Sequence, residues 1–300
     1  MTKEVKGIFV AMITPFTERG EIYSDGIRNI VEWLERNRVH GIFPNSSTGE
    51  ALKMKSNERI TVAKKTVEAA SSNVMVTPGV SGNTIEHALS EARQIADLGA
   101  DAVVIIPPYY YKLSMEAMEK YYTEIAERVD IPIILYNIPS AACNFLDVEL
   151  VKTLSENDKF IGIKDSSGNI EHIRALIKEI GNKISVMQGS ELLLLPTLAL
   201  GGRGGVLGVA NLVPKLFVEL YNAFMSKDLE KASALQILAY DVLDAVYLGS
   251  ADSFFYCVKY ALNSIGIDVG YPRQPYTIPS EKEEERVRKL IDTLKEKNLL

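Results

Sequence analysis

The sequence predicts an α/β protein, a TIM (β/α)8 barrel with a C-terminal helical extension, and two observations support this prediction. First, short apolar runs alternate with longer amphipathic segments, which is the pattern of successive βα units. Second, none of the runs alternates between polar and apolar residues, as is typical of parallel strands covered on both faces. The eight runs occupy residues 8–13, 41–46, 74–80, 102–108, 132–139, 160–164, 184–190 and 205–211.

The segments between these runs begin with residues that commonly start helices. Ser, Asn or Thr, often with an acidic residue in the first turn, precedes the apolar periodicity. These start signals lie at residues 24–25, 56–58, 83–84 and 114–116. A Rossmann fold is the rival arrangement, but residues 14–17, after the first run, are TPFT rather than a GxGxxG motif.

The chain after residue 213 contains helical patterns only, which we expect to form helices at 215–225, 229–248, 253–265 and 280–297. We therefore expect a catalytic barrel domain at residues 1–213 and a helical region at 214–300 that packs on it. No linker rich in Pro, Gly or Ser separates the two parts. The apolar run at 192–200 contains a proline and is too short to span a bilayer, so we expect a buried helix there.

The composition narrows the possible partners and compartments. Hydrophobic residues make up 47% of the chain, enough for a sizeable core, and the net charge of −6 argues against nucleic acid or an anionic membrane surface as a partner. The two cysteines, Cys143 and Cys257, form no CxxC pair, and no signal-peptide pattern is present, so we expect a cytoplasmic protein. The three histidines lie far apart in the sequence, so we expect no metal site.

Polar residues gather where the predicted strands end, which is where a TIM barrel carries its active site. They lie at residues 45–50, 109–111, 136–137, 164–166, 189–191 and 208–211. Together they would bring one amine, several phenols and hydroxyls, and loops of small residues to one mouth of the barrel.

Lys164 ends the apolar run FIGIK and is the first candidate catalytic residue. Apolar surroundings favour the neutral form of a lysine amine, which can attack a carbonyl carbon to form a Schiff base. The structural alternative is a lysine that snorkels from the strand end or pairs with a carboxylate. Tyr136 follows the apolar residues PIIL of the neighbouring run and is either a core residue with a satisfied hydroxyl or a proton carrier beside the amine.

Two further groups have a functional and a structural interpretation. Ser47 and Thr48 supply two hydroxyls next to backbone N–H groups, which suits a carboxylate ligand, and a simple helix cap is the alternative. The three tyrosines at 109–111 either contribute to a binding site or pack as ordinary aromatic residues.

Taken together, these motifs resemble those of the pyruvate-dependent class I aldolases, the superfamily of dihydrodipicolinate synthase and N-acetylneuraminate lyase. The resemblance covers the whole barrel in order and extends into the tail. It implies a TIM barrel, a homotetramer built as a dimer of dimers, a small-molecule substrate, and a Schiff base on the enzyme's own lysine in place of a cofactor. The motifs are ITPFT (13–17), SSTGE (46–50), PPYYY (107–111), YNIP (136–139), GIKDSSG (162–168) and GYPRQP (270–275).

The resemblance assigns catalytic roles to three residues. Lys164 matches the lysine that forms a Schiff base with pyruvate or a 2-keto acid. Tyr136 matches the tyrosine of YNxP, which moves the proton while the carbon–carbon bond forms or breaks. Tyr110 matches a tyrosine that reaches into the neighbouring subunit's site in some members.

The resemblance also implies a set of substrate-binding residues. Ser47 and Thr48 would hold the pyruvate carboxylate, as the hydroxyls of the family's GTTGE loop do, and Ser46 replaces the first glycine of that loop. Ser166 and Glu191 would meet the rest of the substrate chain. The complete set is Ser47, Thr48, Ser166, Gly189, Glu191, Val206 and Gly208.

Individual residues distinguish among members of the superfamily. Ala141 stands where dihydrodipicolinate synthases carry an arginine that holds the aldehyde's carboxylate, and alanine cannot form that bidentate pair. N-acetylneuraminate lyases carry two consecutive acidic residues where this chain has Glu191 and Leu192, and a hydroxyl-bearing residue where it has Gly208. Both comparisons argue against those two activities.

The archaeal 2-keto-3-deoxygluconate aldolases match best, through the PYYY run, the GSE at 189–191 and the GYPRQP tail. Leu113 stands where members that also cleave the 6-phosphate carry an arginine, so we expect the non-phosphorylated substrate. Ile138 and Cys143 depart from the usual pattern of those enzymes.

The sequence therefore predicts a lyase that reversibly cleaves a 2-keto-3-deoxy sugar acid to pyruvate and an aldehyde. The alternatives within the superfamily are N-acetylneuraminate cleavage, a reaction like that of dihydrodipicolinate synthase, and dehydration of a sugar acid. A binding barrel without catalysis is the alternative from another class, and the presence of both Lys164 and Tyr136 counts against it.

Overall fold

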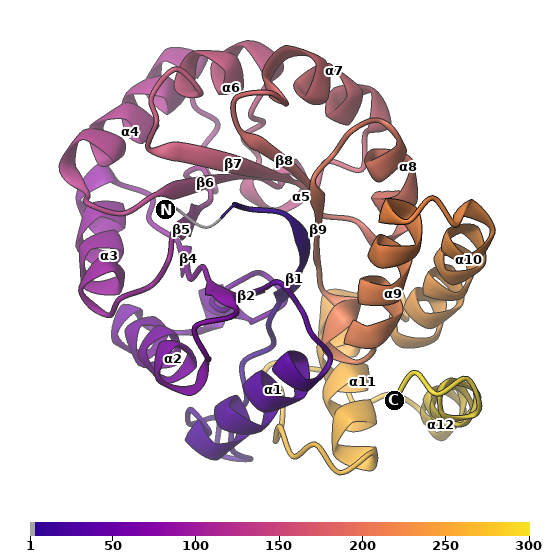
Figure 1. Cartoon of the computed structure of the whole chain (residues 1–300). Helices are drawn as coiled ribbons and strands as arrows, with labels where there is room; N and C mark the ends of the chain where they lie inside the picture. The colour runs from indigo at the N-terminus through magenta and orange to yellow at the C-terminus, as the bar shows by residue number, and fades with distance from the viewer. Residues whose placement is uncertain (1–3) are drawn as a thin grey trace.

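A computed structural model describes residues 4–300 and shows a barrel of parallel strands within a ring of helices (Figure 1). The strands lie in the order β3-β2-β1-β9-β8-β7-β6-β5-β4, and every neighbouring pair is parallel. The strands are β1 (Gly7–Ala11), β2 (Gly41–Phe43), β3 (Met75–Val76), β4 (Gly79–Val80), β5 (Val103–Ile105), β6 (Ile133–Asn137), β7 (Phe160–Asp165), β8 (Ser185–Gln188) and β9 (Gly204–Leu207).

The barrel closes through the third apolar run, which supplies both β3 and β4. On one side of this run, the Thr77 N–H donates to the Ile42 carbonyl at 2.9 Å; on the other, the Val104 N–H donates to the Pro78 carbonyl at 2.9 Å. One continuous segment therefore forms hydrogen bonds to β2 and to β5. The eight predicted runs thus occupy eight strand positions of the barrel. This arrangement confirms the predicted TIM barrel.

Helices follow the strands around the ring, and two of the expected caps form. The Thr84 side chain accepts a hydrogen bond from the His87 N–H, and the Ser114 side chain accepts one from the Ala117 N–H. Ser24 and Ser56 are instead the first residues of their helices. The helices are α1 (Ser24–Arg36), α2 (Ser56–Ala69), α3 (Ile85–Asp97), α4 (Met115–Arg128), α5 (Pro139–Ala142), α6 (Val148–Leu154), α7 (Ile170–Ile180) and α8 (Leu194–Ala199), with 3-10 turns η1 (Ala51–Lys53), η2 (Glu191–Leu193) and η3 (Val209–Asn211).

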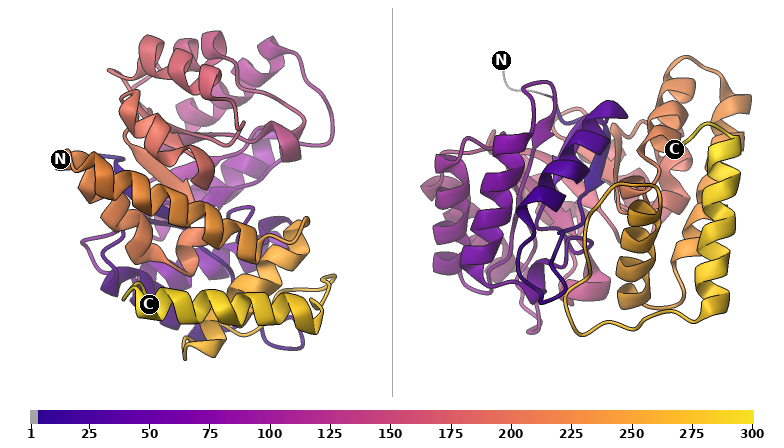
Figure 2. Two further views of the ribbon diagram at one scale, coloured as in Figure 1. Left: turned by 90° about the vertical axis from the view of Figure 1, so that its right-hand side faces the viewer. Right: turned by 90° about the horizontal axis from the view of Figure 1, so that it is seen from below.

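The C-terminal helices lie within a few residues of their expected positions. They are α9 (Pro214–Met225), α10 (Leu229–Val246), α11 (Ala251–Ser264) and α12 (Glu281–Glu296). Helix α9 packs on β1 and α8, and α10, α11 and α12 lie together on one flank of the barrel (Figure 2). A single apolar cluster contains Val10 of β1, Phe217 of α9 and Val258 of α11, so hydrophobic packing continues across the boundary we expect between residues 213 and 214. That boundary stays a prediction.

The apolar run at 192–200 forms the turn η2 and the short helix α8. Leu194 and Leu198 are buried, whereas Leu192 and Leu200 are exposed, so the segment is buried on one face only. Among residues 4–300, no helix is both long enough and apolar enough to cross a membrane.

Candidate active site

Lys164 of β7 and Tyr136 of β6 lie side by side inside the barrel. The two residues are paired in register, and the Lys164 Nζ donates a hydrogen bond to the Tyr136 Oη at 3.1 Å. Their exposed fractions are only 4% and 2%. Two neighbouring strands therefore place the amine and the phenol in direct contact in a buried setting.

The lysine amine also lies close to two aromatic rings. Its Nζ lies 4.2 Å from the centroid of the Tyr136 ring and 5.1 Å from that of Phe43 on β2. Aromatic faces attract a cation weakly and do not hold it as a carboxylate does. Within residues 4–300, the amine is therefore held in place without an ion pair that would occupy its nitrogen.

The carboxylate of Asp165 follows the lysine directly but points into a separate network. It accepts a hydrogen bond from Asn137 Nδ2 at 2.6 Å and from the Ser167 Oγ at 2.5 Å, and it lies 2.9 Å from His172 Nδ1. Burial raises the pKa of Asp165, but the hydrogen bonds from His172, Ser167 and Asn137 outweigh it and lower that pKa below its usual range. Because Asn137 follows Tyr136, this network also joins the ends of the two strands that carry the amine and the phenol.

A cavity of about 290 Å³ opens at the C-terminal ends of the strands, above Lys164. Nine of the ten residues predicted for the site line it, and they come from loops far apart in the sequence. The nine are Ser47, Thr48, Tyr136, Lys164, Ser166, Gly189, Glu191, Val206 and Gly208.

The loop that carries Ser47 and Thr48 is shaped by its buried neighbours. The Ser46 Oγ accepts a hydrogen bond from the Gly49 N–H at 2.9 Å, and the Thr14 hydroxyl donates to the Gly49 carbonyl at 2.6 Å. The serine that replaces the family's first glycine is thus used within the loop. Its two following hydroxyl-bearing residues are left at the cavity, where they suit a carboxylate.

Two glycines make room for side chains of the site. A Cβ on Gly189 would lie 1.9 Å from the Ser166 Oγ, and a Cβ on Gly208 would lie 2.9 Å from the Thr48 Oγ1. A larger residue at either position would therefore displace a hydroxyl that lines the cavity.

Glu191 lines the cavity, but one of its two carboxylate oxygens already accepts hydrogen bonds from the backbone. Its Oε1 accepts hydrogen bonds from the backbone N–H groups of Gly208 and Val209, at 2.7 and 2.9 Å. One carboxylate oxygen therefore fixes the start of η3. Only the other oxygen is left for the substrate contact that the sequence predicts.

Tyr110 is the one predicted site residue that does not line the cavity. It is 81% exposed, and its ring packs edge-on against that of Tyr111 at 4.9 Å between centroids. Its role in a neighbouring subunit's site remains a prediction.

Several residues of the cavity were not anticipated from the sequence. Ile138 of the YNIP motif lines the wall, and Phe43 approaches the amine although it does not line this cavity. The remaining ones come from α10, α11 and the connection between them. They are Leu243, Tyr247, Ala251, Phe254 and Phe255. Within the sequence, the pair Phe254-Phe255 at the start of a helix was the available signal, but helical spacing alone does not place it over the barrel mouth.

The motifs without a catalytic residue meet at a second buried lysine, Lys259 of α11. Its Nζ donates to the Thr14 carbonyl at 2.6 Å, the Glu50 Oε1 at 2.8 Å and the Tyr271 carbonyl at 2.9 Å. Burial lowers the pKa of Lys259 to about 8, against the opposing effect of Glu50. The ITPFT, SSTGE and GYPRQP motifs are thereby joined, and the loop that carries Ser47 and Thr48 is anchored to the C-terminal region.

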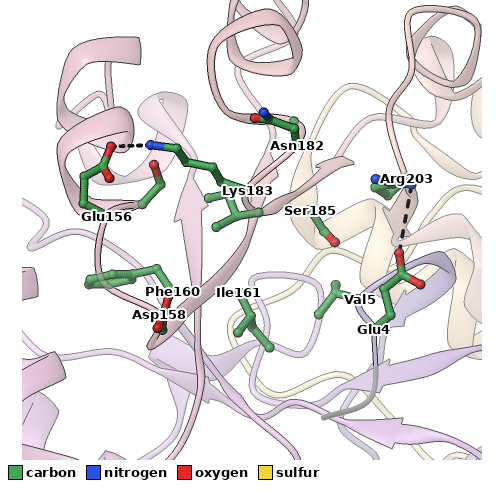
Figure 3. A pocket seen from close by; sticks show the side chains of 13 residues that line it. Glu4, Val5, Glu156, Asp158, Phe160, Ile161, Asn182, Lys183, Ser185 and Arg203 are labelled. Atoms are coloured by element: carbon green, nitrogen blue, oxygen red, sulfur yellow. Dashed lines mark hydrogen bonds and ion pairs between the residues drawn. The ribbon is translucent and has the colours of Figure 1, made fainter. Parts of the chain in front are cut away.

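A larger hollow, of about 610 Å³, lies at the opposite end of the barrel (Figure 3). Four of its charged groups form ion pairs, Lys183 with Glu156 and Arg203 with Glu4 at 4.0 Å, and Asp158 also lines it. Catalytic residues of TIM barrels lie at the other face, so volume alone does not make this hollow a candidate. Within residues 4–300, no group of three or more His, Cys, Asp or Glu side chains could hold a metal ion.

Comparison with known proteins identifies the family of the chain. The Dihydrodipicolinate synthetase family matches residues 4–294 of the chain. The chain belongs to this family. A 4-hydroxy-tetrahydrodipicolinate synthase of Archaeoglobus fulgidus is 32% identical, covering 96% of this chain and 98% of its own. An uncharacterized DapA-like lyase of Thermococcus kodakarensis is 38% identical, covering 96% and 99%.

Solved structures of family members have the same fold. Dihydrodipicolinate synthase of Bacillus anthracis superposes with a TM-score of 0.91 at 28% identity, covering 97% of this chain and 98% of its own. A prophage protein of the family from E. coli, in complex with pyruvate, gives a TM-score of 0.90 at 27% identity and covers 99% of both chains. The family consists of lyases of the class I aldolase type, which use a lysine Schiff base with pyruvate and no cofactor. The predicted superfamily and enzyme class are confirmed.

Proposed function

We propose that Lys164 is the Schiff-base lysine of this chain and that the enzyme reversibly cleaves a 2-keto acid to pyruvate and an aldehyde. The observation that carries the proposal is the buried contact of 3.1 Å between Lys164 Nζ and Tyr136 Oη, at the base of a cavity that Ser47 and Thr48 also line. A nucleophile and a proton carrier in hydrogen-bond contact are what this chemistry requires.

Tyr136 balances the protons of each step. The Lys164 amine adds to the C2 carbonyl of the substrate, and the Tyr136 hydroxyl gives its proton to the departing hydroxide, which leaves as water. An iminium cation and a Tyr136 phenolate remain. The phenolate then takes the proton of the C4 hydroxyl while the C3–C4 bond breaks, and the electron pair moves into the iminium to give an enamine and a free aldehyde.

Release of pyruvate reverses the first half of the sequence. The Tyr136 hydroxyl returns a proton to C3 of the enamine, so that iminium and phenolate form again. Water then adds to C2, the phenolate takes up the proton that this water loses, and pyruvate leaves the free amine. Ser47 and Thr48 hold the pyruvate carboxylate throughout, beside Val206.

The motifs favour a 2-keto-3-deoxy sugar acid of the 2-keto-3-deoxygluconate type as the substrate, so that the aldehyde half is a polyol. Ala141 in place of the arginine of dihydrodipicolinate synthases supports this choice, because no guanidinium is available there for a second carboxylate. N-acetylneuraminate cleavage, a reaction like that of dihydrodipicolinate synthase, and dehydration of a sugar acid are the alternatives. We also propose a cytoplasmic homotetramer in which Tyr110 serves a neighbouring subunit's site.

Reduction with borohydride in the presence of pyruvate tests the proposal. We expect one covalent adduct, which peptide mass analysis places on Lys164. Lys259 is the internal control, because it is also buried but hydrogen-bonded to three oxygen atoms. A protein that binds pyruvate without any adduct, at every pH tried, would contradict the Schiff base. Product analysis separates cleavage, which releases pyruvate and an aldehyde, from dehydration, which leaves the carbon chain intact.

A further inference from the structure

The outer wall of the active-site cavity is apolar and comes from the C-terminal region. Leu243 of α10, Ala251 of α11 and the rings of Phe254 and Phe255 line it, together with Tyr247 between the two helices. Beyond the groups that face pyruvate, this is the surface that the aldehyde half of a substrate would meet.

Phe254 brings this wall close to the reacting centre. It is 8% exposed, and its Cζ lies 3.4 Å from the position that a Cβ on Gly208 would occupy. The same position lies 2.9 Å from the Thr48 Oγ1 and 3.6 Å from the Glu191 Oε1. The phenyl ring and the Thr48 hydroxyl therefore both lie close to the same point of the cavity, beside Gly208.

A small hollow of about 30 Å³ continues the cavity on its other side and is also apolar. It shares Tyr136 and Ile138 with the main cavity. Its other walls include Ile106, Ala141 and Ala142. A substrate chain that turns either way from Lys164 therefore meets mainly hydrocarbon, although Asn45, Ser81 and Tyr109 also line the small hollow.

Few polar side chains remain for a polyol. In the proposed reaction the pyruvate half uses Lys164 and Tyr136 as well as the two hydroxyls of the 47–48 loop. Glu191 has one oxygen bound to backbone amides. In the main cavity that leaves the Ser166 hydroxyl, the second Glu191 oxygen and the half-exposed Tyr247 phenol. The small hollow adds the side chains of Asn45, Ser81 and Tyr109. Hydroxyls buried without partners disfavour binding, whereas apolar groups gain from burial on this wall.

We infer that the aldehyde partner of this enzyme has an apolar body, branched aliphatic or aromatic, and that Phe254 and Leu243 select it over a polyhydroxylated aldehyde. The inference rests on the proposed function and concerns its aldehyde half only, where an apolar aldehyde and the polyol of the sugar acid are the two candidates that the experiment below decides between. In the synthetic direction, pyruvate should condense with such aldehydes. A polyhydroxylated aldehyde is then the substrate with which they are compared.

Matched aldehydes and matched variants test this preference. Propanal and glyceraldehyde have the same carbon chain and differ by two hydroxyls, and each is condensed with pyruvate. We expect kcat/KM to favour propanal by about tenfold or more, and an aromatic aldehyde to be accepted as well. Because the two aldehydes differ in intrinsic reactivity, the decisive quantity is the change of their ratio between variants.

Phe254→Asn should shift this ratio toward glyceraldehyde by about tenfold, whereas Phe254→Leu should leave it nearly unchanged. Leu243→Asn gives the same test from the other helix should Phe254→Asn not fold. Ile237→Asn is the matched control, because Ile237 lies on the same helix as Leu243 but is 61% exposed and outside the cavity.

The outcomes separate the inference from the proposed function. A pyruvate adduct on Lys164, together with a ratio that favours glyceraldehyde or does not respond to Phe254→Asn and Leu243→Asn, overturns the apolar preference and leaves the aldolase intact. Absence of the adduct overturns both.

Discussion

Two buried lysines occupy opposite chemical situations in this molecule. Lys164 of β7 is 4% exposed and contacts one phenol hydroxyl and two aromatic rings. Lys259 of α11 is 1% exposed and donates to two backbone carbonyls and the carboxylate of Glu50. Lys259 also lies over an aromatic ring, 4.8 Å from the centroid of Phe16. Burial and aromatic contact are thus common to both lysines, and their oxygen partners differ.

This difference shows what separates a nucleophile from a structural cation. An ammonium group has three protons to donate, and at Lys259 each has an oxygen acceptor, so the group holds motifs together and offers no free electron pair. At Lys164 the recorded polar contact is to the hydroxyl that the proposed mechanism uses for proton transfer. Variants of the two residues should therefore fail in different ways.

Lys164→Ala should give the largest effect, a fall of kcat by at least about 10⁴-fold, as expected when a covalent nucleophile is removed. The fold should remain, because no carboxylate is left without its cation. Steady-state kinetics and borohydride trapping with pyruvate measure the loss, and circular dichroism checks the fold. Turnover that survives in Lys164→Ala would contradict the assignment of Lys164 as the nucleophile and of Lys259 as the structural cation.

Lys259→Met should fail through stability, because it leaves the buried Glu50 without one of its cations. Breaking a buried ion pair from one side costs about 3–5 kcal/mol of unfolding free energy. Denaturant unfolding measures it, and Lys120→Met, at a lysine whose side chain is 71% exposed, serves as the control. We expect the folded fraction of Lys259→Met to form the pyruvate adduct on Lys164; an adduct lost without loss of stability would reverse the assignment.

Tyr136→Phe tests whether the hydroxyl that contacts Lys164 takes part in the reaction, unlike the oxygen partners of Lys259. It retains the ring that packs on the amine and removes only the hydroxyl, so kcat should fall by about 10²–10⁴-fold, the usual contribution of a proton carrier. The pyruvate adduct should still form, but more slowly. Rapid-quench trapping of the adduct measures this, and an unchanged rate of both steps would exclude the proton role.

The inner half of the site could be predicted from the sequence because strand ends in a barrel converge. Lys164 and Tyr136 end successive apolar runs, and successive strands are neighbours, so their contact follows from the fold class. The 47–48 loop and Gly189 join them for the same reason. Local sequence and a single topological rule were sufficient there.

The outer half depends on packing between segments that no local pattern connects. Phe254 and Phe255 read as part of an ordinary amphipathic helix, and only the docking of α11 on the barrel places them at the cavity. The same holds for Lys259, which lies 209 residues from Glu50 in the sequence. The motifs alone predict a sugar acid, because they contain no residue of the apolar wall.

The smallest effect is expected at Glu58, which contacts Arg273 of the same GYPRQP motif that Lys259 binds through Tyr271. Arg273 of the GYPRQP motif donates to both Glu58 oxygens, at 2.6 and 2.9 Å. This hydrogen bonding lowers the pKa of Glu58 to about 2, against the opposing effect of partial burial. A carboxylate whose folded-state pKa is lowered stabilises the protein above its unfolded pKa, here about 4.5, and loses that contribution as the pH falls toward 2.

Glu58→Gln should therefore lower the unfolding free energy by about 1–3 kcal/mol at pH 6 and make little difference near pH 2. Denaturant unfolding as a function of pH measures the two curves. Glu283→Gln is the matched control, since Glu283 occupies the same capping-box position at α12 as Glu58 does at α2, and its effect should be smaller. Equal pH dependence in the two variants would mean that helix capping, and not the contact with Arg273, accounts for the contribution of Glu58.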